Sequence, residues 1–218
     1  MIQPVLVIGN KNYSSWSLRP WLLLRYFEIP FEEVYIPLYT PGSVNEIARY
    51  SPSGLVPALK DGELMVWDSL AIGEYLNERF PSLGMWPEDK VERALARSVS
   101  AEMHAGFSAL RQAMSMNIRA RRPGRGRTKE SLADIERVIG IWSDCRERNR
   151  AKGAFLFGRF TIADAMFAPV VLRFQTYEVP LVGDARTYAD AILALPAMQE
   201  WIAAAATEQE RIAMFEDD

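Results

Sequence analysis

Hydrophobic and polar positions divide the chain into two parts with different periodicity. In the first 80 residues, apolar runs of three to five residues alternate with segments whose apolar residues recur every three or four positions. Short apolar runs are typical of strands, and the longer spacing is typical of helices that bury one face. The expected strands are 5–8, 31–35, 58–60 and 64–67, and the expected helices are 19–27, 44–50 and 69–80.

The resulting order, β-α-β-α-β-β-α, predicts a mixed sheet. Two parallel strands need a helical crossover between them, whereas the Asp61-Gly62 turn favours an antiparallel hairpin of the last two strands. Residues 81–87 follow with two prolines and a glycine, and they predict a linker between two domains.

Beyond this segment the pattern is helical throughout. Apolar residues at three- or four-residue spacing between Val91 and Met114 predict one long amphipathic helix. Further helices are expected over 132–148, 162–175, 186–193 and 197–206. The expected organisation is an α/β domain over 1–80, the linker 81–87, and an all-helical bundle domain over 88–218.

Composition narrows the class of protein. Apolar residues make up 49% of the 218 residues and charged residues 24%, which is typical of a globular protein and not of a disordered one. A net charge of −3 does not favour nucleic acid or anionic membranes as partners. One local exception has six basic residues in the eleven positions from Arg119 to Lys129, but no aromatic residue is interleaved with them, so we expect a solvated loop.

Cysteine and histidine each occur once, as Cys145 and His104. An internal disulfide, a Cys-x-x-Cys redox pair and a histidine-cluster metal site are therefore not expected, and no metal is predicted. The first apolar run is too short for a secretory signal, and no stretch approaches the roughly 20 apolar residues of a membrane span. We expect a cytoplasmic protein.

Three short motifs carry candidate chemistry. Asn12-Tyr-Ser-Ser-Trp-Ser17 places four hydroxyls between the first strand and the first helix, Val56-Pro57 stands at the head of the third strand, and Asp68-Ser69 opens the third helix. Each has a purely structural explanation, because Ser and Asp are favoured helix caps and proline suits the first residue of a strand.

Together these motifs and the β-α-β-α-β-β-α order resemble the cytosolic glutathione S-transferase family over almost the whole chain. Thr161-Ile-Ala-Asp164 also resembles the family's capping box in the core helix of the helical domain. The resemblance implies a thioredoxin-like domain that binds glutathione, a helical domain that shapes the pocket of a small electrophile, and a homodimer. Such enzymes act in detoxification.

The resemblance also implies roles for single residues. Val56, before a cis Pro57, would bind the cysteinyl part of glutathione through its backbone, as an added strand does. Ser69 and the amides of its helix N-terminus would hold the γ-glutamyl carboxylate, and Asp68 would face the γ-glutamyl ammonium. Gly54 and Leu55 stand where the family often has polar residues, so the partner of the glycyl carboxylate stays open.

The serine-rich motif is where the thiol would be activated. In serine-type members such as the zeta class, a Ser-Ser-Cys-Ser motif is followed by Trp and Arg, and its first serine faces the sulfur. That serine corresponds to Ser14, with Ser15 second and Trp16 in the place of the cysteine. Ser15 and Tyr13 are the alternatives to Ser14, and Ser17 is expected to cap the first helix.

One hydroxyl can supply the required stabilisation. Lowering a thiol pKa of about 8.5 by about two units corresponds to about 2.7 kcal/mol, and a hydrogen bond to a charged acceptor contributes about 1.5 to 3 kcal/mol. Trp16 favours conjugation over redox chemistry. A zeta-like maleylacetoacetate isomerase and a non-catalytic relative of the stringent starvation type stay open, and His104, Arg111 and Arg173 are further candidates for the second-substrate pocket.

Overall fold

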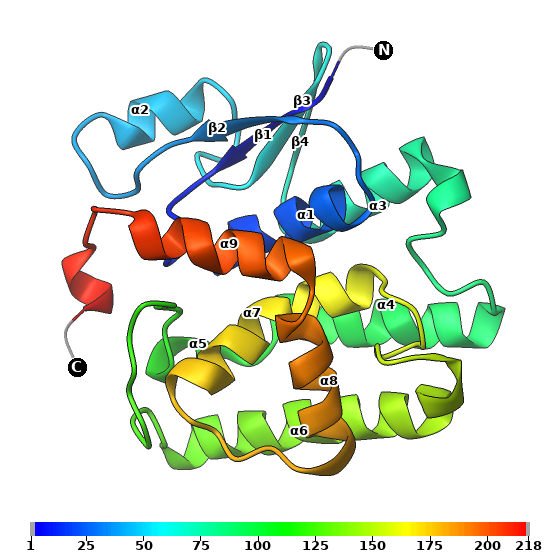
Figure 1. Ribbon diagram of the computed structural model, residues 1–218. Coiled ribbons are helices and arrows are strands. Elements are labelled where there is room, and N and C mark those ends of the chain that lie inside the picture. Colours follow the sequence, from blue (N-terminus) through cyan, green and yellow to red (C-terminus); the bar gives the residue numbers. More distant parts are fainter. Residues whose placement is uncertain (1–2, 217–218) are drawn as a thin grey trace.

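A four-stranded mixed sheet lies at one end of the molecule, as the computed structural model shows for residues 3–216 (Figure 1). Its strands are β1 (Val5–Ile8), β2 (Glu32–Tyr35), β3 (Ala58–Asp61) and β4 (Leu64–Trp67), in the spatial order β2-β1-β3-β4. β1 pairs with β2 in parallel, and β3 is antiparallel to both β1 and β4. The predicted mixed sheet is confirmed.

Helices cover both faces of this sheet, because the side chains of a strand alternate between its faces. The helices are α1 (Ser15–Tyr26), α2 (Ser43–Ala48) and α3 (Ser69–Arg79). Leu6 and Ile8 of β1 point into the main core together with residues of α1 and α3, whereas Val7 packs with Ile47 of α2 in a second, smaller cluster. α1 and α3 therefore lie on the face of the sheet toward the helical second half, and α2 covers the other face (Figure 1).

The second half of the described chain is helical, as predicted. It comprises α4 (Lys90–Ala105), α5 (Ser108–Ala113), α6 (Lys129–Asn149), α7 (Ile162–Thr176), α8 (Gly183–Leu193) and α9 (Pro196–Thr207). The short 3₁₀ turns η1 (Pro81–Leu83), η2 (Arg150–Lys152) and η3 (Ala213–Phe215) connect or follow them. Among these helices, none is both long and apolar enough to cross a membrane.

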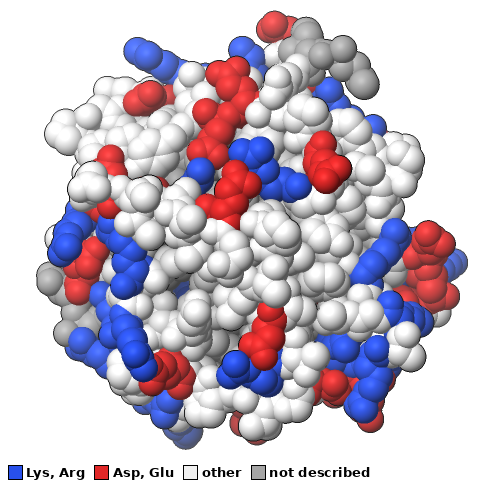
Figure 2. Space-filling model, in the orientation of Figure 1, with Lys and Arg blue, Asp and Glu red and all other residues white. Residues whose placement is uncertain are grey.

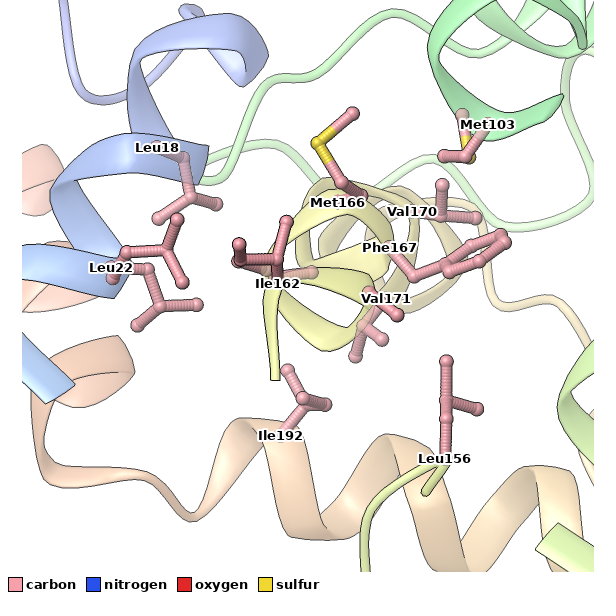
Figure 3. Packing of buried hydrophobic residues seen from close by; sticks show 14 of the residues in the cluster. Leu18, Leu22, Met103, Leu156, Ile162, Met166, Phe167, Val170, Val171 and Ile192 are labelled. Atoms are coloured by element: carbon pink, nitrogen blue, oxygen red, sulfur yellow. The ribbon is translucent and has the colours of Figure 1, made fainter. Parts of the chain in front are cut away.

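α7 forms the centre of the molecule. All its residues except Gln175 are buried, and the predicted capping box is present at its start, where Asp164 accepts the Thr161 N–H at 2.7 Å. Figure 3 shows α7 side chains directed to opposite sides, with Ile162 facing Leu18 and Leu22 of α1. The sheet half and the helical half thus share one hydrophobic core.

The predicted single helix from Val91 to Met114 is wrong. α4 ends at Ala105, Gly106 is extended, and Phe107 has a left-handed backbone with φ of 58° before α5 begins. A Cβ at Gly106 would lie 2.7 Å from the Glu102 carbonyl oxygen, so only glycine fits this helix end. The apolar spacing continues across the break because Leu110 and Met114 still face the core.

The predicted linker 81–87 is partly buried. It begins with η1, and Met85 and Trp86 then insert into the main core. The division into domains 1–80 and 88–218 stays a prediction.

Candidate functional site

A cavity of about 870 Å³ opens between the sheet half and the helical half. Its lining contains all six residues predicted to bind or activate glutathione, namely Ser14, Ser15, Val56, Pro57, Asp68 and Ser69. It also contains the further candidates Tyr13, His104, Arg111 and Arg173. Segments far apart in the sequence therefore meet at one place.

Ser14 is the N-cap of α1. Its Oγ accepts the Ser17 N–H at 3.4 Å and donates to the Ser17 Oγ at 2.7 Å, and the Ser17 Oγ accepts the Gly9 N–H at 3.2 Å. The expectation that Ser17 caps the helix is wrong, because α1 begins at Ser15 and not near Pro20, which places Ser17 inside the first turn. Ser17 instead ties the turn to the end of β1.

Ser15 faces α7. Its hydroxyl accepts a hydrogen bond from Nη2 of Arg173 at 3.2 Å, and the Arg173 Nε donates to the Met114 carbonyl at 2.8 Å. Both side chains are buried. Ser15 therefore positions a buried guanidinium at the wall of the cavity.

Tyr13 faces the C-terminal segment 208–216. Its hydroxyl donates to Glu216, accepts from Nη2 of Arg119 at 2.9 Å, and lies 3.4 Å from the Ile212 N–H. Its ring contacts that of Phe215, with centroids 5.7 Å apart. These contacts fasten the segment 208–216 across the cavity and occupy the Tyr13 hydroxyl.

The basic segment 119–129 holds the same C-terminal segment. Arg119 donates to the carbonyl oxygens of Glu208 and Glu210, and the buried Arg122 donates to those of Phe215 and Glu216. The expected solvated loop is therefore wrong for these two arginines. On the face seen in Figure 2, basic and acidic side chains are interspersed.

The peptide bond between Val56 and Pro57 is cis, as expected, and it precedes β3. Pro57 is buried against the sheet while Val56 is half-buried at the cavity. A strand-like peptide could therefore lie along the backbone of Val56.

Asp68 is the N-cap of α3. Its Oδ1 accepts the N–H groups of Leu70 at 2.9 Å and Ala71 at 3.2 Å. A bound carboxylate would consequently rely on the amide and hydroxyl of Ser69, not on the next two amides. Asp68 has φ of 76°, a region that costs a non-glycine residue about 1 to 3 kcal/mol and that is concentrated at functional sites.

Three arginines surround the start of α1. The guanidinium carbons of Arg19 and Arg111 lie 4.3 Å and 4.7 Å from the centroid of the Trp16 ring, and Arg173 lies behind Ser15. Burial lowers the pKa of all three guanidinium groups, that of Arg173 to about 10, and the charge of Arg111 lowers the pKa of Arg19 and Arg173 further. Asp68 acts in the opposite direction on Arg19. Of the three, Arg111 and Arg173 line the cavity, and guanidinium groups at this wall suit an anionic ligand.

Within residues 3–216, no three His, Cys, Asp or Glu side chains are placed so that they could hold a metal ion.

Family models account for most of this architecture. The model of the glutathione S-transferase N-terminal domain matches residues 13–79, and that of the C-terminal domain matches residues 95–204. This chain belongs to the glutathione S-transferase family.

Curated relatives of this chain match only in part. A dichloromethane dehalogenase from Methylorubrum extorquens is 43% identical over 61 residues, which is 27% of the chain and 21% of that protein. A probable maleylacetoacetate isomerase from Vibrio cholerae is 37% identical over 106 residues, 45% of the chain and 49% of the relative. The matches thus span half or less of these relatives.

Solved glutathione transferases share the fold over at least 95% of this chain. A transferase homologue from Burkholderia with bound glutathione aligns with 95% of this chain and 100% of its own, at 21% identity and a TM-score of 0.73. A glutathione S-transferase from Rhodospirillum rubrum gives a TM-score of 0.71 at 18% identity, over 97% of this chain and 94% of its own.

Some residues of the cavity were not predicted. Tyr39 and Phe215 line it, and no local sequence pattern marks either residue. Phe215 comes about 200 residues after the serine-rich motif that it approaches. Arg19 follows the serine-rich motif, and its buried guanidinium donates to the Ser69 Oγ at 3.3 Å, so it connects this segment with Asp68-Ser69.

Proposed function

We propose that this chain is a glutathione transferase in which Ser14 stabilises the glutathione thiolate. The thiolate sulfur forms a bond to an electrophilic carbon of a hydrophobic or unsaturated substrate, the thiol proton passes to solvent, and a leaving group departs or the added carbanion is protonated. Positioning of the two substrates would supply much of the acceleration. No step in this scheme requires a metal.

The observation that carries this proposal is the meeting of the three predicted motifs in one cavity. Ser14, Val56 and Asp68 come from three segments of the chain, yet all line the same space of about 870 Å³. This volume is in the range of small-molecule sites, about 300 to 1,000 Å³. We assign the backbone of Val56 beside Pro57 to the cysteinyl group, Ser69 to the γ-glutamyl carboxylate, and Asp68 to the γ-glutamyl ammonium.

The hydrogen bonds of Ser14 are compatible with this role. A hydroxyl has one proton and two lone pairs and can rotate. If the Ser17 hydroxyl donates to Ser14, the Ser14 proton becomes available to a thiolate while Ser14 still accepts from the Ser17 N–H. The positive end of α1 would stabilise the same negative charge. Ser15, the second candidate, would act through Arg173, which it contacts.

Replacement of Ser14 tests the proposal. Loss of one hydrogen bond to a charged acceptor costs about 1.5 to 3 kcal/mol, so Ser14→Ala should raise the pKa of bound glutathione by about one to two units. The thiolate absorbance as a function of pH measures this shift, and kcat for a chloro-arene should fall about 10- to 100-fold at neutral pH.

Two controls accompany this variant. Ser14→Thr keeps the hydroxyl and should retain most of the activity, and Ser98→Ala changes an exposed serine of α4 and should behave as wild type. A Ser14→Ala protein that conjugates the chloro-arene as fast as wild type would refute the role of Ser14.

A second candidate is a zeta-like glutathione-dependent isomerase. The two arginines that line the cavity, Arg111 and Arg173, favour it, because a maleyl diketo acid is anionic. Several partly matching relatives are also named maleylacetoacetate isomerases. Trp16 in the place of the zeta-class cysteine favours conjugation. Turnover of a maleyl diketo acid compared with that of a chloro-arene separates the two activities.

The remaining features belong to the same proposal: a cytoplasmic homodimer with a glutathione-binding domain over 1–80, a linker over 81–87, and a helical domain over 88–218. Calorimetry with millimolar glutathione tests whether the protein binds glutathione, on which this proposal depends. Absence of binding would favour a non-catalytic protein of the stringent starvation type.

A further inference from the structure

His104 connects the helical half of the molecule to Asp68. It lies in the last turn of α4, and its Nε2 is 3.1 Å from Oδ2 of Asp68, while Oδ1 of the same carboxylate accepts the Leu70 and Ala71 amides. Both carboxylate oxygens are therefore held, one by its own helix and one by a residue 36 positions further along the chain.

The surroundings of His104 indicate its tautomer. Its Nδ1 is buried and has no hydrogen-bond partner among residues 3–216, so a proton there would be a buried, unpaired N–H group. A neutral ring with its proton on Nε2 donates to Asp68 and leaves only a lone pair at Nδ1.

The charged groups that face the ring act in both directions. Burial lowers the pKa of His104, Asp68 raises it, and Arg19 of α1 and Arg111 of α5 lower it. The net direction is downward, so the ring is neutral at pH 7 and remains a neutral donor.

His104 also contacts Trp16, which lines the same cavity. Its ring meets the Trp16 ring edge to face, with centroids 5.4 Å apart and an interplanar angle of 77°. This contact, together with the bond to Asp68, restricts the orientation of the imidazole.

We propose that His104 is a positioning residue that orients the Asp68 carboxylate toward the γ-glutamyl ammonium of glutathione. The inference rests on the proposed function, because it assumes that glutathione binds at Asp68. A neutral donor suits this task, since it fixes the carboxylate without cancelling the negative charge that attracts the ammonium. A Lys or Arg at this position would compete with the ligand for the same charge.

Two ligands that differ only in the ammonium test the proposal. Calorimetry would compare glutathione with glutaryl-cysteinyl-glycine, which lacks the amino group, on the wild-type protein and on His104→Ala and His104→Gln. We expect His104→Ala to weaken glutathione about five- to tenfold and to leave the deaminated peptide within about twofold. His104→Gln keeps an N–H donor and should recover most of the loss.

Acidification provides a second readout. Protonated His104 would oppose the ammonium, so the preference of wild type for glutathione over the deaminated peptide should decline as the pH falls from about 7.5 to about 5. The His104→Gln protein should keep its preference over this range.

Glu102→Gln is the matched control, because Glu102 lies on the same helix but pairs with Arg137 at 2.7 Å on the exposed side. It should bind both ligands as wild type does. Three results would overturn the role of His104: equal glutathione affinities of His104→Ala and wild type, an equal loss of affinity for both ligands, or a decline of the preference in His104→Gln that is as large as in wild type when the pH falls. If the wild-type protein binds no glutathione, the proposed function fails as well.

Discussion

At the scale of single residues, Trp16 combines packing with electrostatics. Its ring lies within 5 Å of the guanidinium carbons of Arg19 and Arg111 and meets His104 at its edge. An aromatic face stabilises a cation that has lost part of its hydration, by about 2 kcal/mol when desolvated. The tryptophan thus helps to keep positive charge beside the predicted thiolate.

Asp164 shows how burial changes the value of a cap. It accepts the N–H groups of Leu156 and Thr161 and the Thr161 hydroxyl, and it is fully buried. Asp164→Ala leaves these donors unpaired, at about 1 to 3 kcal/mol each, so we expect a loss of about 3 to 5 kcal/mol in the free energy of unfolding. Denaturant unfolding measures it.

Asp89, the N-cap of α4, is the matched control for this variant. It accepts the Val91 and Glu92 amides in an exposed position, and Asp89→Ala should cost only about 1 kcal/mol. Similar losses in the two variants would contradict the effect of burial.

The pH dependence of stability gives a second prediction for Asp164. Burial raises its pKa from 3.8 to about 6, although the hydrogen bonds from Leu156 and Thr161 oppose the shift. Because the folded state holds this proton more tightly than the unfolded chain, the contribution of the group is greatest below pH 3.8 and is lost as the pH rises through about 6. Asp164→Asn should remove this pH-dependent part of the free energy of unfolding, which denaturant unfolding between about pH 4 and 7 would measure. A variant whose stability changes with pH as that of wild type does would contradict the prediction.

At the scale of elements, the C-terminal segment 208–216 depends on contacts from distant parts of the chain. Glu208 accepts the backbone N–H groups of Lys11 and Asn12. Arg119 donates to the carbonyl oxygens of Glu208 and Glu210, and Arg122 donates to those of Phe215 and Glu216. Phe215 lines the cavity and contacts the rings of Tyr13 and Tyr39. The segment is therefore expected to shape access for the electrophile.

Arg119→Met tests how this segment is fastened. The change removes hydrogen bonds to two carbonyl oxygens and to the Tyr13 hydroxyl, each worth about 1 kcal/mol. The segment 208–216 should therefore detach from the rest of the protein about tenfold or more often. A glutamate-specific protease should cleave at Glu208 and Glu210 correspondingly faster. Arg125→Met, an exposed arginine in the same loop, should be cleaved as wild type, and equal rates for both variants would refute the role of Arg119.

At the scale of the whole molecule, one hydrophobic core joins the sheet half to the helical half. It contains Leu6 of β1, Leu22 of α1 and Trp142 of α6, whereas the smaller cluster around Val7 and Ile47 lies on the other face of the sheet. The two halves should consequently unfold together.

Leu22→Ala should reveal this coupling. Removing a fully buried leucine costs about 2 to 5 kcal/mol, and hydrogen exchange should accelerate in α6 and α7 as well as in α1. Ile47→Ala alters the smaller cluster and should accelerate exchange mainly in α2. Acceleration confined to α1, α3 and the sheet after Leu22→Ala would contradict a shared core.

The sequence by itself determined the elements and the motifs. Apolar periodicity located the four strands and most helices to within a few residues, because strand and helix spacing report which face is buried. Thr161 and Asp164 were predictable as a capping box because their bonds are local. Ser14, Val56-Pro57 and Asp68-Ser69 were grouped by their resemblance to a family pattern, since each motif taken alone has a purely structural explanation.

Only the tertiary structure decided what depends on contacts between distant residues. The break at Gly106 was missed because the apolar spacing continues across it, and the cap of α1 was assigned to Ser17 because several hydroxyls there can serve as caps. Three contacts of this kind join residues 36 to 158 positions apart: His104 with Asp68, Arg119 with Glu208, and Arg173 with Ser15. Such contacts arise from packing of whole elements, and a local pattern carries no information about which elements will meet.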